Sequence, residues 1–234
     1  MSYAEGRATR RSPCMSLPTS LAGRVCLALF LMYVVFFYWY TSFGGPLTEE
    51  EIAHYKGVVT QVAEAQGNPE RVAVWEEFMR GDTGDDFVMI NVIDMRDTPL
   101  QIPGVEPGET SDEVVAKYQA PFLGRAALSA AHPVLMGFAA APAVDIWGIE
   151  GADHWDRGGL VRYRSRRDLM KQIETIHEGG GDGVHAFKVA AIEKTIAYPL
   201  DPWFQLGDPR FVFALVFAVI GLSVKAFSKS DGEA

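Results

Sequence analysis

Cysteine is nearly absent from this chain of 234 residues, which holds only Cys14 and Cys26. Neither falls within residues 44–209, so that stretch can form no internal disulfide and no thiolate metal site. Its stability must come from an apolar core, which a chain of this length can supply. Hydrophobic residues make up 48% of the sequence, and this share excludes disorder as the dominant state.

Motifs that hold metals, phosphates or catalytic nucleophiles are also missing. The five histidines form neither H-E-x-x-H nor H-x-x-E-H, and no spacing matches an EF-hand loop. The run of glycines at 179–183 lacks the G-K-[ST] ending of a phosphate loop and is interpreted as a linker. No G-x-S-x-G elbow occurs. We therefore expect no metal, no cofactor and no catalytic residue.

The mean hydropathy of the chain is +0.05 although its net charge is −9, because two uncharged apolar runs raise the average. Residues 25–43 would reach about 28 Å as a helix, close to the thickness of a bilayer core. The second run, 211–224, extends to 210–227 if its flanking basic side chains snorkel. A cleaved signal peptide is the alternative for the first run. An uncleaved anchor is favoured because the run is long and ends in bulky aromatics.

Charge is distributed unequally around these runs. Residues 1–24 carry a formal charge of +3, and Lys225 and Lys229 lie in or after the second run. Residues 44–209 hold 14 basic and 27 acidic residues, a charge of −13. The positive-inside rule places both termini in the cytoplasm and the acidic part outside, which in a bacterium means the periplasmic side of the inner membrane. We expect no binding of nucleic acid, because so acidic a domain repels a polyanion.

The predicted organisation is a domain between two transmembrane helices. Helices are expected over 47–65, 69–79, 111–130 (bent near Pro121) and 165–177, and strands over 87–95, 134–147, 159–164 and 187–198. Thr48 with Glu51, and Ser165 with Asp168, have the spacing of capping boxes at the starts of the first and last of these helices. The order from residue 87 onward is β-α-β-β-α-β, which indicates an α+β, ferredoxin-like fold with one sheet face left to be covered. The expected divisions are a cytoplasmic tail (1–24), a span (25–43), a helical lead-in (44–85), the domain (86–200), an interfacial linker (201–209), a span (210–227) and a cytoplasmic tail (228–234).

The stretches AKYQAPFLGRAALSAAHPVLMG and VDIWGIEGADHWDRGGLVRYRSRRDLMKQI carry a resemblance to a known superfamily. The chain resembles an uncharacterised branch of the dimeric α+β barrel proteins over roughly residues 86–198. The resemblance implies the ferredoxin-like fold and pairing with a second copy. Relatives include monooxygenases and isomerases, so it implies fold more strongly than function, and it transfers no catalytic residue.

Three sets of residues are candidates for a site. The first, which we call the arginine cluster, allows an anion site or a structural ion-pair network with Asp145, Asp156 and Asp168; the network is favoured because acidic partners are abundant. The second would line a barrel interior. For the histidine in this set, His132, a packing or turn role is favoured over a role as a general base. The third would pack the first span against other helices, with plain lipid exposure equally compatible. These sets are Arg162, Arg164, Arg166 and Arg167; His132, Trp147 and Tyr163; and Tyr33, Phe36, Phe37, Trp39 and Tyr40.

The sequence thus predicts a non-catalytic accessory or scaffold subunit of a membrane complex, in contact with membrane lipids. The acidic domain is expected to self-associate, to join other subunits, or to attract a basic soluble protein such as cytochrome c. The alternative is a membrane-tethered monooxygenase or isomerase that uses the barrel interior.

Overall fold

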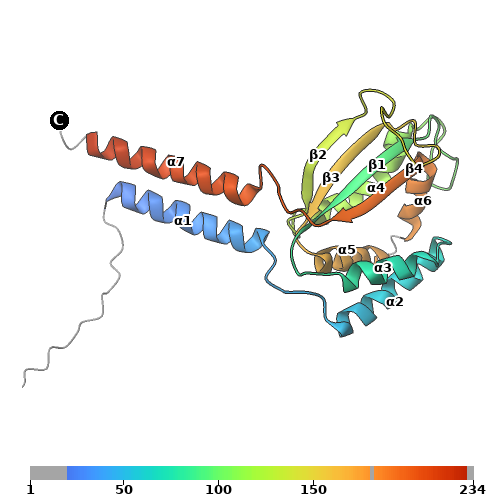
Figure 1. Ribbon diagram of the computed structural model, residues 1–234, viewed down its shortest axis with the longest axis horizontal. Helices are drawn as coiled ribbons and strands as arrows, with labels where there is room; N and C mark the ends of the chain where they lie inside the picture. Colours follow the sequence, from blue (N-terminus) through green and yellow to red (C-terminus); the bar gives the residue numbers. More distant parts are fainter. Residues whose placement is uncertain (1–19, 180–181, 231–234) are drawn as a thin grey trace, which may run out of the picture. The chain divides into compact units, whose positions relative to one another are not determined.

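The computed structural model describes residues 20–179 and 182–230, and the chain divides into two compact units (Figure 1). One unit comprises the residues up to Phe37 and those from Gly207 onward, and the other comprises Tyr38–Leu206. Most of the expected N-terminal tail, with Cys14, lies outside the described residues, as do the glycines at 180 and 181 and residues 231–234.

Two long apolar helices form the first unit, α1 (Leu21–Tyr40, up to Phe37) and α7 (Pro209–Ser230). They run antiparallel, because Phe36 meets Phe213 at 4.7 Å between ring centroids while Cys26 lies near Gly221. Both helices are long and apolar enough to cross a membrane. A buried core helix or a signal sequence can share that length and composition.

A four-stranded antiparallel sheet, in the order β2-β3-β1-β4, forms the centre of the second unit (Figure 1). Its strands are β1 (Phe87–Met95), β2 (His132–Phe138), β3 (Arg157–Tyr163) and β4 (Ile192–Leu200). The prediction of an α+β architecture is confirmed, and β1 has the predicted bounds.

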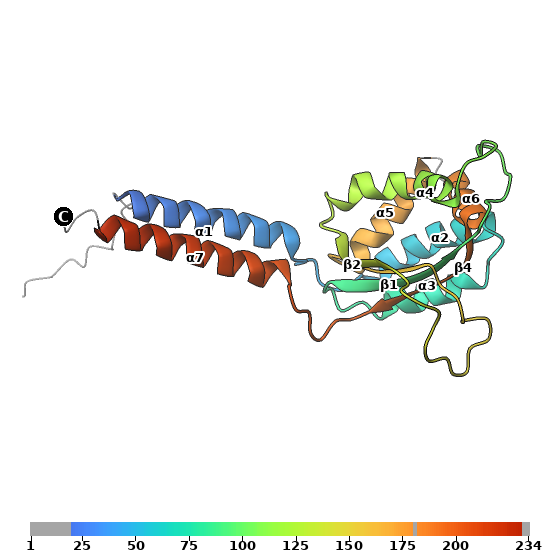
Figure 2. The ribbon, with the colours of Figure 1, turned by 90° about the horizontal axis from the view of Figure 1, so that it is seen from above.

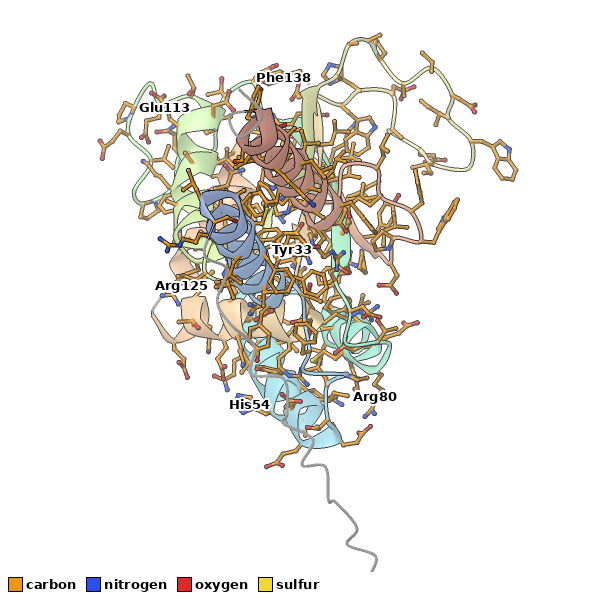
Figure 3. The ribbon with its side chains drawn as sticks, turned by 90° about the vertical axis from the view of Figure 1, so that its left-hand side faces the viewer. Tyr33, His54, Arg80, Glu113, Arg125 and Phe138 are labelled. Carbon is orange, nitrogen blue, oxygen red and sulfur yellow. The ribbon has the colours of Figure 1, made fainter. Side chains whose placement is uncertain are left out.

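Helices α4 (Ser111–Ala126), α5 (Arg166–Glu178) and α6 (Asp182–Ala191) lie on one side of this sheet, with α2 (Glu49–Ala65) and α3 (Arg71–Arg80) packed beside α5 (Figure 2). Local sequence signals explain where several of them begin. The Thr48 hydroxyl accepts the Glu51 N–H while the Glu51 carboxylate accepts the Thr48 N–H, which is the predicted capping box. Ser165 caps α5 by accepting the N–H of Asp168, as predicted. Charged side chains such as Glu113 of α4 and Arg80 of α3 project from the outer surface of the helices (Figure 3).

Two of the predicted strands differ from the observed ones by more than two residues at one end. The extended region expected over 134–147 is a strand only as far as Phe138, and residues 139–156 form a loop. The strand expected over 187–198 begins at Ile192, because the preceding residues, from Asp182 to Ala191, form α6. The Gly-rich linker is correspondingly shorter. Phe187 and Ala190 pack against the α4 side of the core, and the helical spacing brings both to that side.

Two apolar clusters hold the helices in place. The first joins α2, α3 and α5 through Tyr55, Val59, Met79 and Met170, which are all buried. The second joins α4, α6 and the sheet. Its buried members are Val105, Val114, Val115, Ala190, Ala191 and Ile192.

The sheet face away from α4, α5 and α6, here called the open face, carries apolar side chains in register. Leu135, Leu160, Ile90 and Tyr198 are cross-strand partners and form one row across all four strands. A second row consists of Gly137, Gly158, Val92 and Ile196. Leu135, Ile196, Tyr198 and Leu200 are exposed.

Strand register also defines the two ends of the sheet. His132, Arg162, Val88 and Leu200 form the row at one end, where residues 38–41 reach the sheet and residues 201–206 leave it. At the opposite end Phe138 and Arg157 are partners, and they flank the 139–156 loop. The loop is therefore remote from both points where the chain enters and leaves this unit.

Candidate functional site

The arginine cluster extends from the end of β3 into the first turn of α5, so its four side chains leave the backbone within six residues. Strand alternation sends Arg162 to the open face and Tyr163 to the helix face. Ser165 then ends the extended run by capping α5, which starts at Arg166. One short stretch of chain thus carries four guanidinium groups from the end of β3 into the first turn of α5.

Arg162 has the most buried side chain of the cluster, with a relative exposure of 0%. Its Nε donates to Asp86 Oδ2 at 2.8 Å, Nη1 donates to the Ala130 carbonyl at 3.1 Å, and Nη2 donates to the Tyr40 carbonyl at 2.9 Å. The Tyr40 ring covers the guanidinium at 3.7 Å. A buried charge with this set of partners is compensated by hydrogen bonds and by the tyrosine π face.

Arg164 and Arg167 bind the same segment of chain, residues 38–47, which we call the junction segment. Arg164 Nη1 donates to the Trp39 carbonyl at 2.9 Å. Arg167 donates to the Gly45 carbonyl at 3.0 Å and to the Pro46 carbonyl at 2.8 Å. Together with Arg162, these side chains hold four backbone carbonyls of the junction segment against the domain.

The junction segment also requires a glycine beneath it. Gly84 has φ 84°. A Cβ at this position would lie 2.4 Å from the backbone carbon of Gly45. Asp82 accepts hydrogen bonds from the N–H groups of Leu47 and Gly84, at 2.8 and 3.0 Å. The turn at 81–84 therefore forms a close-fitting support for the junction segment.

Carboxylates neutralise the remaining charge of the cluster. Arg164 forms a bidentate ion pair with Asp168, in which Nε donates to Oδ2 at 2.7 Å and Nη2 donates to Oδ1 at 2.8 Å. Arg166 Nη2 donates to Asp201 Oδ2 at 3.0 Å. Burial would raise the pKa of Asp168, but hydrogen bonds from Arg164 and Ser165 outweigh it and lower that pKa. Asp168 was among the expected partners. Asp145 and Asp156 form no ion pair with the cluster in the described part of the chain. The geometry is that of a structural network, with the guanidinium groups directed at protein atoms.

Glu51 gives this network a measurable pH dependence. The Arg167 guanidinium donates to both Glu51 oxygens and lowers the pKa of that carboxyl from 4.5 to about 2. A carboxyl with a lowered folded-state pKa stabilises the fold above pH 4.5, and this stabilisation disappears as the pH falls toward 2. Because the Glu51 side chain is partly exposed, we expect Glu51→Gln to cost only about 1 kcal/mol at pH 7 and to flatten the stability profile below pH 5. Urea titrations between pH 2 and 7 measure this.

Glu50→Gln is the matched control, since Glu50 is the preceding residue in the same first turn of α2 and its side chain makes no hydrogen bond or ion pair with the arginine cluster in the described part of the chain. Glutamine at position 51 can retain the capping box. Equal slopes for wild type and Glu51→Gln below pH 5 would contradict the assignment of this carboxyl.

The residues predicted to line a barrel interior do not come together. His132 lies on the open face, where Nε2 is 2.7 Å from the Tyr40 hydroxyl. Tyr163 lies on the helix face and stacks on Phe87 at 5.2 Å, and burial raises its pKa. Trp147 is 93% exposed in the 139–156 loop. These three side chains therefore define no common cavity.

The aromatic residues of α1 separate into two groups. Tyr33 donates its hydroxyl to the Arg210 carbonyl at 3.1 Å, and Phe36 packs edge-to-face on Phe213. Phe37 meets Tyr33 at 5.9 Å within the same helix. Trp39 and Tyr40 belong to the second unit, where their backbone carbonyls accept hydrogen bonds from Arg164 and Arg162. Packing of these five residues against helices of other proteins or against lipid stays a prediction.

Sequence patterns did not reveal a group of polar residues between α4 and α6. Lys188 lies 5.6 Å over the Tyr118 ring, and His185 meets the same ring edge-to-face at 6.4 Å. Burial lowers the pKa of Lys188 and of His185, and raises that of Tyr118 to about 12. The i, i+3 spacing on α6 would have revealed the group, but only if 182–191 had been recognised as helix.

A cavity of about 260 Å³ adjoins His185. Its other lining residues come from the end of α2, the segment before α4, and α6. Most are apolar: Ala65, Leu100, Ile102, Ala186, Val189 and Ala190.

Comparisons with known proteins provide a structural match but no family. No protein-family model and no curated protein matches the chain. Two crystal structures of RPA0582 match, one of the methylated protein and one described as a protein of unknown function from Rhodopseudomonas palustris. Both matches have a TM-score of 0.44. The structure of the methylated protein shares 18% sequence identity with this chain, and the match covers 58% of this chain and 93% of RPA0582. For the second structure the identity is 19%, and the match covers 57% of this chain and 94% of RPA0582. The resemblance to dimeric α+β barrel proteins stays a prediction.

Proposed function

We propose that this chain is a membrane-anchored accessory or scaffold protein whose domain self-associates through the open face of its sheet. The observation that carries the proposal is the apolar row Leu135–Leu160–Ile90–Tyr198, which no helix of the described chain covers. A contiguous apolar surface of this kind favours association, because its burial removes hydrocarbon from water.

The proposed fold relationship is to the ferredoxin-like domains that pair as dimeric α+β barrels. The order of strands β2-β3-β1-β4 and the sequence of elements from β1 to β4 support it. In such a pair two open faces meet, and each copy supplies the cover that the other lacks.

The proposed location is a cytoplasmic membrane, with α1 and α7 as spans and the acidic domain on the outer side. Length and composition of the two helices support spanning. Arg24, near the start of α1, and Lys225, near the end of α7, are basic residues at the helix ends closest to the chain termini. Together with the acidic start of α2, they support cytoplasmic termini. The arginine cluster suits this role, because it holds the junction segment, which begins in the last turn of α1, against the domain.

The mass of the native protein in mild detergent tests this function. We expect a dimer, or a stoichiometric complex with further membrane subunits, when the full chain is purified from its native membrane and weighed by native mass spectrometry. A monomer without partners at micromolar concentration would overturn the proposal.

A basic soluble protein such as cytochrome c is the proposed docking partner for the acidic domain, whose formal charge over 44–209 is −13. We expect association to slow by about tenfold or more when salt rises from about 10 to 150 mM, as the Debye length falls from about 30 to 8 Å. Surface plasmon resonance on nanodisc-held protein measures the rate. Cytochrome with acetylated lysines is the control, and a rate independent of salt would exclude electrostatic docking.

Lys188 favours the second candidate, a membrane-tethered enzyme. An ammonium whose pKa is lowered by burial, beside Tyr118 and His185, is the kind of group that acts in proton transfer or as a nucleophile. The same purification distinguishes this function from the first. An isolated dimer that carries a bound small molecule would favour the enzyme.

A further inference from the structure

Three potential metal ligands gather where the 139–156 loop returns to the sheet. They are Asp94 near the end of β1, and His154 and Asp156 just before β3. One donor atom from each lies within 4.8 Å of the other two. This group lies at the end of the sheet opposite the arginine cluster and is used by none of the functions proposed above.

Backbone hydrogen bonds hold the group in place. The Asp156 N–H donates to the Ile93 carbonyl at 3.0 Å, and the Ala139 N–H donates to the Asp156 carbonyl at 2.7 Å. Residue 156 is thereby fixed between β1 and the end of β2. Two positions earlier in the chain, His154 reaches Asp94, with Nδ1 at 2.9 Å from Oδ1. The loop therefore presents a nitrogen and a carboxylate toward a carboxylate of the sheet.

We propose that Asp94, His154 and Asp156 bind a divalent transition-metal ion, best matched by Zn²⁺, and that this ion ties the 139–156 loop to β1. One imidazole and two carboxylates form a three-ligand set of the type that zinc accepts, with water in the fourth position. Zinc bonds of about 2.0–2.2 Å place tetrahedral donors about 3.4 Å apart, so the observed donors need only small movements. His154 can make them, since its side chain is 64% exposed.

Asp156 can ligate without losing its structural role. One of its oxygens, Oδ2, accepts the N–H of Met95 at 2.5 Å. A carboxylate has a second oxygen, which remains available to the ion.

Lys194 competes with the ion for Asp94. Its ammonium lies 3.4 Å from Asp94 Oδ2, so in the described structure a cationic group already neutralises this carboxylate. The ammonium also donates to the Gly151 carbonyl at 2.5 Å and lies 4.9 Å over the Trp155 ring. It can therefore leave Asp94 and keep two other favourable contacts in the same loop.

Calorimetric titration of the full chain in detergent with ZnCl₂ tests the site. We expect one ion per chain, with affinity reduced by more than about tenfold in Asp94→Asn and in His154→Ala, since loss of outer-shell partners alone causes reductions of that size. Lys194→Met should bind about threefold more tightly, because removing an exposed ion pair has a modest effect. Co²⁺ in place of Zn²⁺ should give the visible absorption of a tetrahedral site.

His54→Ala is the matched control, because His54 is an exposed histidine that pairs with one carboxylate, Glu174, at 2.5 Å. We expect wild-type affinity for this variant. Zinc binding that is unchanged in both His154→Ala and Asp94→Asn, or the absence of saturable binding, would overturn the site. Circular dichroism of each variant separates loss of a ligand from loss of fold.

Hydrogen exchange tests the effect on the loop. Zinc should slow exchange of amides between residues 140 and 153 in wild type and leave them unchanged in His154→Ala. Unaltered exchange in a zinc-bound wild-type protein would overturn the tie between loop and strand.

Discussion

Replacing Arg162 by methionine should lower the free energy of unfolding of the domain by about 3–5 kcal/mol, the usual cost of removing one partner from a buried ion pair. The substitution removes the hydrogen bonds that Arg162 donates to Asp86, to the Ala130 carbonyl and to the Tyr40 carbonyl. Methionine fills much of the volume but donates no hydrogen bond to those acceptors. Denaturant titration of the full chain in detergent, followed by tryptophan fluorescence, measures the loss.

Arg125→Met is the control for a simple loss of positive charge. Arg125 lies exposed near the end of α4, so the same substitution there should change stability by no more than about 0.5 kcal/mol (Figure 3). Arg162→Lys keeps the charge but cannot reach three acceptors in a planar fork, so its loss should be intermediate. Equal effects of Arg162→Met and Arg125→Met would show that the buried network contributes little.

The role of Arg162 shows what the sequence could not reveal. An arginine on a strand, among other arginines, is compatible with an anion site or with an ion-pair network. Its partners Tyr40 and Asp86 lie 122 and 76 residues away in sequence, and no local spacing predicts either contact. By contrast, the Thr48 capping box depends on residues within one helical turn, and the sequence predicts it correctly.

The error over 187–191 has a similar physical origin. Phe187 and Val189 favour a strand locally, and the residues after Ala191 do form one. Small side chains at Ala190 and Ala191 let α6 pack closely on α4, next to Val114 and Val115. Tertiary packing therefore overrides the local preference for a strand. The same helix places Lys188 over the Tyr118 ring, a contact that the prediction of a strand over these residues does not include.

Replacing Ile196 by aspartate should convert the proposed dimer into a monomer. Ile196 is exposed on the open face, beside the Leu135–Leu160–Ile90–Tyr198 row, so a dimer through this face buries it. A carboxylate buried there without a partner would oppose association by several kcal/mol. Native mass spectrometry and sedimentation in detergent measure the change, which should exceed about a hundredfold in dissociation constant.

Ala197→Asp is the control, because it adds the same charge at the next residue of β4 on the opposite face of the strand. That variant should remain a dimer.

Gly137 and Gly158 allow a second test of the same interface. They lie in the row that contains Ile196, and they leave the part of the open face formed by β2 and β3 without side chains in that row. A side chain from a second copy can approach the backbone closely there, and Gly137→Leu should weaken the dimer by filling that space. If Ile196→Asp and Ala197→Asp weaken association equally, the contact involves net charge and the open face is not the interface.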